Sequence, residues 1–393
     1  MNGDAGNIEN LHVANAGAGK DVAGKATIGC EDIDAIIFWL SATPGVGAAA
    51  IRRICTLDTP GRILRMGGQE FFACCLGSKA QWQAIQAARP YFGAAEAELG
   101  RLNGMGVSFV TFLDARYPQR LSVLPDAPAG LYVKGALPAD GVASCAVVGA
   151  RLCSPYGRQV AYRLGEILGK SKVQVVSGLA SGIDVAAHRG AIAAGGDTFG
   201  ILGCGVDLCY PRENFNTYYQ MQRQGGVISE FPMGTKPLAQ LFPVRNRIIS
   251  ALADILVVVE AKEKSGSFIT VEHALGQGKE VFAVPGRLSD PLSLGCNRLI
   301  QMGANILTDL WEIPEYLGIS GKKKPALREK SANTLAKAEK MLYSCMDLQP
   351  KSTGALIEES GLGVPDAMSA LFSLEMEGYV ECVSGGYART LRR

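Results

Sequence analysis

The sequence Cys145–Asp184, CAVVGARLCSPYGRQVAYRLGEILGKSKVQVVSGLASGID, contains two short apolar runs that each end in small residues. The runs are Cys145–Gly149 and Val173–Ser177, and a helical stretch separates them. Strands that are apolar throughout and joined by helices are typical of a parallel sheet with helices on both faces. This stretch therefore predicts a β-α-β unit of an α/β protein.

The same alternation continues between about residues 107 and 309. Four more apolar runs, separated by helical stretches, extend the predicted sheet: Thr198–Gly203, Val227–Glu230, Ile255–Glu260 and Val281–Val284. Ligands of such folds bind at the carboxyl ends of the strands, where the loops meet. We therefore expect the functional residues in the loops that follow these strands.

The flanking sequence differs in composition from this central part. Residues 1–30 have almost no large apolar side chains, whereas Ile33, Ile36, Ile37 and Leu40 show helical spacing. Lys and Arg are concentrated after residue 320. The expected divisions are a disordered tail at 1–30, a helical domain at 31–105, a sheet domain at 106–318, a basic linker at 319–333 and a small C-terminal unit at 334–393.

Two flanking units have features of small DNA-binding modules. The turn Pro44–Gly47, with a helix on each side, resembles a helix-hairpin-helix unit, and it is equally consistent with a plain packing corner between two helices. The C-terminal unit shows the pattern of three helices and a two-stranded hairpin. That pattern suggests a winged helix, which binds either DNA or a partner protein.

Composition limits the class of protein. The formal net charge is only +2, with 39 Lys and Arg against 37 Asp and Glu, so any binding of nucleic acid needs a local concentration of donors. The 11 cysteines are odd in number and form no CxxC pair, which favours free thiols in a reducing cytoplasm over disulfides or a metal site. No apolar run approaches the ~18 residues of a membrane span, so we expect a cytoplasmic protein without a membrane segment.

The sequence Phe242–Asp254, FPVRNRIISALAD, has the strongest phosphate-binding pattern. We expect Arg245, Asn246 and Arg247 at the N-terminus of a helix, where backbone N–H groups and guanidinium groups together attract phosphate oxygens. Phe242 stands just before them and could stack on a base. The cluster therefore suits a polynucleotide as well as a free nucleotide.

Loops after other strands add further donors. Arg151 stands where a dinucleotide fingerprint would need glycine, so it either clamps phosphate or pairs with a carboxylate. The loop Ser177–Asp184 offers small residues and N–H groups as an anion nest, with Asp184 as a helix cap or loop organiser. His188 is expected to be a satisfied core residue.

Motifs for bond-breaking chemistry are missing from the sequence. It contains no GxxxxGK[ST] loop, no GxSxG or HExxH motif, and no paired carboxylates at a strand end. Many phosphate donors without a nucleophile, base or metal cage indicate a binding surface, with no cofactor.

Eight ordered blocks across about residues 146–304 closely resemble the DNA-processing protein A family, also called DprA or Smf. They are VVGARLCSPYG, SGLASGIDVAAH, LGCGVDLCYP, SEFPMG, FPVRNRII, SGSFIT, EVFAVPG and LGCNRLIQMGA. The resemblance implies an extended Rossmann-like domain between an N-terminal helical domain of the SAM or helix-hairpin-helix type and a C-terminal winged helix ending in GGYART. Ala251 and Ala253 depart from the Gly and Ser common in the family.

The resemblance also implies a function. It implies a cytoplasmic homodimer that binds and protects single-stranded DNA and loads a RecA-type recombinase on it during natural transformation, without enzymatic activity. Arg151 then corresponds to the arginine that grips the backbone, and Phe242 to the base-stacking ring. The residues expected to contact DNA are Arg151, Ser154, Ser177, Gly178, Ala180, Gly182, Arg212, Phe242, Arg245, Asn246, Arg247, Ser265, Gly266, Ser267 and Thr270.

Two other functions compete with this expectation. A Rossmann-like nucleotide hydrolase of the lysine-decarboxylase-like type would need PGGxGTxxE, and the corresponding strand end reads Val284-Pro285-Gly286-Arg287-Leu288. A scaffold acting only through its winged helix and dimer surface is the third possibility.

Overall fold

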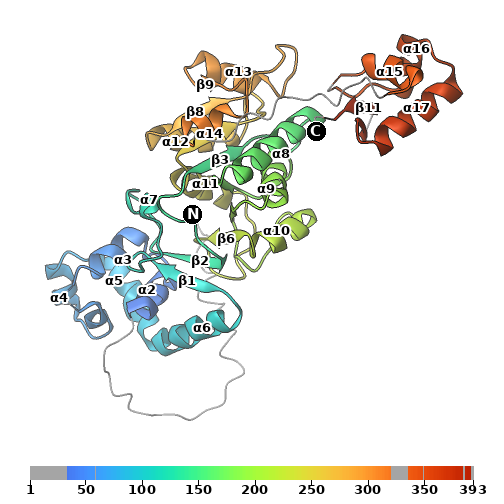
Figure 1. Ribbon diagram of the computed structural model, residues 1–393. Coiled ribbons are helices and arrows are strands. Elements are labelled where there is room, and N and C mark those ends of the chain that lie inside the picture. Colours follow the sequence, from blue (N-terminus) through green and yellow to red (C-terminus); the bar gives the residue numbers. More distant parts are fainter. Residues whose placement is uncertain (1–32, 58, 320–334, 348, 384–385, 391–393) are drawn as a thin grey trace.

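The computed structural model describes residues 33–57, 59–319, 335–347, 349–383 and 386–390. Along the chain, a helical N-terminal unit leads into a large sheet and then into a small C-terminal unit (Figure 1). The predictions of a disordered tail and, beyond residue 319, of a basic linker concern residues outside the described part of the chain.

The N-terminal unit consists of short helices around an apolar core. Its elements are α2 (Ile33–Ala42), α3 (Ala48–Ile54), η1 (Pro60–Leu64), α4 (Gly68–Ala73), α5 (Lys79–Ala88), η2 (Arg89–Tyr91) and α6 (Phe92–Gly104). The helical spacing seen in the sequence buries Ile36, Ile37 and Leu40 almost completely. The ring centroids of Phe38 in this unit and Phe109 at the sheet edge lie 5.0 Å apart. The helices and the sheet therefore share apolar contacts.

The central sheet has nine strands in the order β1-β2-β6-β5-β4-β3-β7-β8-β9. The strands are β1 (Ser108–Thr111), β2 (Gly130–Gly135), β3 (Ser144–Val148), β4 (Gln174–Ser177), β5 (Thr198–Ile201), β6 (Gly225–Ser229), β7 (Ile255–Val258), β8 (Glu280–Ala283) and β9 (Asn305–Ile306). The strands in the part of the sheet ordered β6-β5-β4-β3-β7-β8-β9 all pair in parallel, as the apolar runs predicted. Strands β1 and β2 form an antiparallel edge that the sequence reading missed.

Helices cover both faces of the parallel part (Figure 1). They are α7 (Gln119–Ser122), α8 (Pro155–Lys170), α9 (Ile183–Ala193), η3 (Arg212–Asn214), α10 (Phe215–Met221), α11 (Leu241–Ala251), α12 (Ser267–Gly276), α13 (Leu294–Gln301) and α14 (Glu312–Tyr316). Within β3, Cys145 and Val147 pack with α8 and α9, whereas Ala146 and Val148 pack with the cluster that contains α11 and α12. The alternation of strand side chains therefore supplies two cores from one continuous apolar run.

The C-terminal unit contains three helices and a hairpin, as predicted. They are α15 (Lys337–Ser344), α16 (Thr353–Ser360), α17 (Val364–Met376), β10 (Val380–Val383) and β11 (Gly386–Arg389). Leu342, Leu356, Leu371 and Leu374 form its own fully buried centre. This arrangement is a winged helix. Among the described residues, no helix combines the length and the apolar character needed to cross a membrane.

Candidate functional site

A cavity of about 660 Å³ opens beside the carboxyl ends of β3 and β7. The connection from β3 leads to β4 on one side, and the chain later returns to place β7 on the other side, so the strand order reverses here. Ligands of open α/β sheets bind at such a reversal, because the loops after the two strands part and leave a crevice. The fold therefore forms this cavity where the sequence pattern predicted the functional residues.

Arg151 and Phe242 meet in this cavity. The Arg151 side chain is exposed, and its guanidinium carbon lies 5.3 Å from the centroid of the Phe242 ring. The ring of Tyr210 lies on Phe242 with a centroid separation of 5.8 Å and a tilt of 38°. Cations attract the faces of aromatic rings, and the same faces can stack on bases. The predicted backbone clamp and the predicted stacking ring are thus brought together from distant parts of the chain.

Two lysines that the sequence reading did not single out also line the cavity. Lys262 and Lys264 follow β7 and are exposed. They precede Ser265, Gly266 and Ser267, which line the same wall as predicted. The alternation Ala261-Lys262-Glu263-Lys264 at a strand end could have indicated them. With Arg151, they give the rim a concentration of positive charge that the near-neutral composition conceals.

In the loop after β7, two of the hydroxyl groups form a hydrogen bond with each other. The Ser265 and Ser267 hydroxyls lie 2.8 Å apart, and α12 begins at Ser267. Thr270 lines the cavity but is only 2% exposed. Arg212, by contrast, is exposed on η3 and is not part of the cavity wall. The prediction that Arg212 joins this set therefore finds no support in the geometry.

Arg245 also lines the cavity, but its side chain is almost completely buried. It is 4% exposed and donates hydrogen bonds to the carbonyl oxygens of Gly178, at 2.9 Å, and Ile201. Burial lowers the pKa of its guanidinium to about 10, and Asp184 partly opposes this shift. Arg245 therefore remains charged at neutral pH and ties α11 to the ends of β4 and β5, with its guanidinium 5.9 Å from the Phe242 ring centroid.

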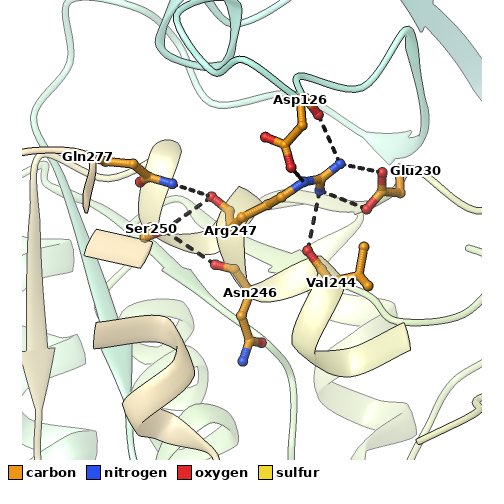
Figure 2. A network of polar contacts seen from close by, with 7 residues as sticks. All are labelled: Asp126, Glu230, Val244, Asn246, Arg247, Ser250 and Gln277. Carbon is orange, nitrogen blue, oxygen red and sulfur yellow. Dashed lines mark hydrogen bonds and ion pairs between the residues drawn. The ribbon is translucent and has the colours of Figure 1, made fainter. Parts of the chain in front are cut away.

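Arg247 does not line this cavity, contrary to the sequence expectation. Its guanidinium donates to Asp126 at 2.7 Å and to both carboxylate oxygens of Glu230 at 2.8 and 2.7 Å (Figure 2). The side chain is buried, and burial opposes its charge, but Glu230 and Asp126 outweigh that effect and raise the pKa of the guanidinium. Its donors are committed to this network, and the residue faces a second cavity of about 470 Å³.

The helix register explains this division. Helix α11 begins at Leu241, so Arg245, Asn246 and Arg247 occupy its second turn. The sequence had led us to expect them at the N-terminus of the helix. Each residue advances about 100° around a helix, which places Phe242, Asn246 and Ile249 on the cavity side and Arg247 on the far side. Figure 2 shows the Asn246 side chain pointing away from Arg247. Within the described residues, its amide has no hydrogen-bond partner, so it is free to meet a ligand.

The anion nest predicted after β4 is already filled by the protein's own carboxylate. Asp184 Oδ2 accepts from the backbone N–H of Gly178 at 3.0 Å and of Ala180 at 3.4 Å. The Ser177 hydroxyl is buried and donates to the Val147 carbonyl at 2.6 Å. Asp184 is thus the loop organiser that the sequence suggested. Of this loop, Ala180 and Asp184 line the cavity, whereas Ser177 and Gly178 do not.

Ser154 is likewise committed inside the protein. It caps α8 by accepting from the Gly157 N–H at 3.0 Å, and its hydroxyl donates to the Glu260 carboxylate at 2.5 Å. Neither Ser154 nor Gly182 lines the cavity, contrary to the sequence expectation. Gly182 has a φ of +82° and approaches the loop that carries Arg151, so that an added Cβ would lie 2.3 Å from the Ala150 carbonyl oxygen.

The titratable groups near the cavity are arranged for structure. His188 is fully buried, its Nδ1 lies 2.6 Å from the Thr198 hydroxyl, and burial lowers the pKa of its imidazole to about 3. Burial raises the pKa of Asp184, against the opposing charge of Arg245. In the part of the chain that the structure describes, no group of three or more His, Cys, Asp or Glu could hold a metal ion, and the ten described cysteines are free thiols.

The site therefore defines a class of protein. The cavity lies at the switch point of a Rossmann-like sheet. Its rim carries cations, two of its rings lie against each other, and Asp184 is bonded within its own loop. Such a cavity suits ligands that combine negative charge with planar groups. Comparison with known proteins identifies the family.

The family model described as DNA recombination-mediator protein A matches residues 108–318, and the DprA winged helix domain matches residues 326–386. The Smf protein of Escherichia coli is 38% identical over 283 residues, covering 70% of this chain and 75% of that protein. DNA processing protein DprA of Streptococcus pneumoniae is 42% identical over 218 residues, covering 56% and 77%. The crystal structure of the latter protein matches with a TM-score of 0.63 at 32% identity, covering 72% of this chain and 97% of that one. The chain belongs to the DprA/Smf family of DNA-processing proteins.

Proposed function

We propose that this protein binds single-stranded DNA in the cavity at the switch point. The observation that carries the proposal is the position of the Arg151 guanidinium over the Phe242 ring, 5.3 Å from its centroid, in a cavity that Lys262 and Lys264 also line. A strand without a partner exposes both phosphates and base faces, so a site that offers cations beside rings suits it better than a duplex, whose base faces are stacked inside.

The expected mode of binding follows from exposure. Arg151, Lys262 and Lys264 are exposed and can neutralise phosphates, whereas buried Arg245 contributes a fixed positive charge below them. Phe242, supported by Tyr210, offers a stacking face worth about 1–3 kcal/mol per base, largely independent of sequence. The amide of Asn246 can serve a phosphate or a base edge, because it lies on the cavity side of α11.

Family membership supports the wider role. We propose that the protein protects incoming single strands in the cytoplasm and loads a RecA-type recombinase on them during natural transformation, and that it acts as a homodimer. These steps rest on the family and not on the geometry of the cavity. A strand-exchange assay with a recombinase, single-stranded DNA and its coating protein tests the loading step: the protein should shorten the lag before filaments form, and an unchanged lag would contradict loading.

The DNA preference is tested by fluorescence anisotropy. Labelled oligo-dT, the matched dT·dA duplex and AMP are compared at several salt concentrations. We expect oligo-dT to bind at least about tenfold more tightly than the duplex, AMP to bind weakly and remain intact, and the oligo-dT affinity to fall as salt increases. Equal binding of strand and duplex, or release of adenine from AMP, would contradict the proposal.

A further inference from the structure

Glu260 contacts both ends of the loop that carries Arg151. It lies two residues beyond the end of β7 and is only 2% exposed. Its carboxylate accepts the hydroxyl of Ser154 at 2.5 Å and the backbone N–H of Ser154 at 2.9 Å. Its backbone carbonyl accepts the N–H of Ala150 at 2.8 Å. The three residues from Arg151 to Cys153 therefore span two fixed points that one residue of a neighbouring strand provides.

The opposite side of the loop is held by the start of α9. The Ile183 N–H donates to the Ala150 carbonyl at 3.2 Å. Gly182 packs so closely that an added Cβ would lie 2.5 Å from the Arg151 carbonyl oxygen. The loop backbone is thus enclosed between β7 and α9, and its path is set by these contacts.

Arg151 itself has no such restraint on its side chain. Within the described residues, the guanidinium forms no ion pair, and it contacts the face of Phe242. Its position over the cavity therefore depends on the backbone from which it projects. We propose that Glu260 is the positioning residue for Arg151: it fixes the loop from behind so that the guanidinium stays beside the Phe242 ring and meets the DNA backbone. This role rests on the DNA-binding function proposed above.

The direction of one mutational effect separates positioning from simple electrostatics. Glu260→Gln removes a carboxylate near a cationic cavity, so a purely electrostatic influence would strengthen the binding of a polyanion. Positioning predicts the reverse. Gln lacks the charge of the carboxylate, and its NH₂ group either faces the N–H of Ser154 or forces the Ser154 hydroxyl to turn from donor to acceptor, so the charge-assisted hydrogen bonds that hold the loop are lost.

The binding experiment measures oligo-dT affinity by anisotropy for Glu260→Gln and for a matched control. Glu263→Gln is the control, because it removes the same charge three residues later from an exposed carboxylate that pairs with Arg298 at 3.2 Å. We expect Glu260→Gln to weaken binding roughly tenfold, about the loss of one charge-assisted phosphate contact, and Glu263→Gln to bind as well as the wild type or slightly better. In an Arg151→Ala background, Glu260→Gln should have little further effect.

Limited proteolysis with trypsin tests the position of the loop in the absence of DNA. Trypsin cleaves after Arg151 only if the loop leaves its fixed path, so the fragment that begins at Leu152, followed by mass spectrometry, should appear faster in Glu260→Gln than in the wild type or in Glu263→Gln. Ser154→Ala, which leaves Glu260 in place and removes one of its hydrogen bonds, should show both effects more weakly. It replaces Glu260→Gln if that variant does not fold.

Four results would overturn the positioning role. The first is unchanged or tighter binding by Glu260→Gln, and the second is a loss of the same size when Glu260→Gln is added to Arg151→Ala. The third is tryptic cleavage after Arg151 at the wild-type rate, and the fourth is that Glu263→Gln has effects as large as those of Glu260→Gln. If the wild type itself fails to bind oligo-dT, the proposed function falls, and this role falls with it. If the wild type binds and Arg151→Ala weakens binding while Glu260→Gln has no effect, only the role of Glu260 is refuted.

Discussion

The carboxylate of Glu230 receives two hydrogen bonds from the guanidinium of Arg247, at 2.8 and 2.7 Å, on the side of α11 that faces away from the cavity beside β3 and β7. Both side chains are largely buried, with 10% and 15% of their side-chain surfaces exposed. The pair connects α11 to the residue that follows β6. The three consecutive residues Arg245, Asn246 and Arg247 thus divide into a buried brace, a cavity-facing amide and an ion-paired anchor.

Removing the anchor should affect stability and not DNA binding. Arg247→Ala leaves Glu230 buried without its partner, which costs about 3–5 kcal/mol for a pair of this kind. We expect a lower melting temperature and a lower free energy of unfolding in guanidinium chloride, with oligo-dT affinity per folded molecule within about twofold of the wild type. A stable variant with strongly reduced DNA affinity would return Arg247 to the binding surface.

The two lysines beyond β7 should contribute separately to the salt dependence. Each phosphate that a cation neutralises on single-stranded DNA contributes about 0.7 to the slope of log affinity against log salt. Lys262→Ala and Lys264→Ala should therefore each flatten the slope by up to about 0.7. Lys79→Ala, at the start of α5 far from the cavity wall, is the control and should leave the slope unchanged. Slopes equal to that of the control would exclude the two lysines from the interface.

The winged helix should not be required for holding single-stranded DNA. Its third helix, α17, contains no Lys or Arg, and four large apolar side chains along it are exposed: Val364 (59%), Met368 (46%), Phe372 (66%) and Met376 (72%). A helix without cations is poorly suited to the negative potential of a DNA groove. A chain that ends at residue 334 should keep the oligo-dT affinity of the full chain within about threefold. A loss of more than tenfold would assign DNA contact to this unit.

Acid should destabilise the protein partly through His188. Burial, reinforced by the charge of Arg245, lowers the pKa of the folded imidazole from 6.5 to about 3. Protons then bind the unfolded chain preferentially, so the contribution of His188 to stability is complete above pH 6.5 and is lost as the pH falls towards 3. The free energy of unfolding then changes through this one group by at most about 1.4 kcal/mol per pH unit. Because the raised pKa values of Asp184 and Glu260 act in the opposite direction, the quantity to measure is the stability difference between the wild type and His188→Gln. That difference should shrink from pH 7 to pH 5, and a constant difference would contradict it.

The parallel core could be predicted from the sequence because its strands are apolar on both faces. The strands β1 and β2 escaped prediction because they lie at a sheet edge, beside the N-terminal helices. The orientation of Arg247 was predictable in principle, since helical steps of about 100° turn it away from the side that carries Phe242, Asn246 and Ile249. The start of the helix at Leu241 was the missing fact.

The internal use of the loop donors could not be predicted in the same way. Ser154 reaches Glu260, and Arg245 reaches the Ile201 carbonyl, through contacts between segments that are neighbours only in the folded protein. A sequence shows which side chains can donate hydrogen bonds, but it does not show which of them the protein itself satisfies. Burial separates the two groups: Arg151, Lys262 and Lys264 remain exposed, whereas Ser177 and Arg245 do not.

The most direct test is the affinity for oligo-dT across a range of salt concentrations, measured for Arg151→Ala and Phe242→Ala beside the wild type. Arg151→Ala should lower the affinity and flatten the salt slope by about 0.7, because it removes a phosphate contact. Phe242→Ala should lower the affinity by about 1–3 kcal/mol at every salt concentration while leaving the slope unchanged, because stacking involves no counterion. Wild-type affinity and slope in both variants would show that single-stranded DNA does not bind in this cavity.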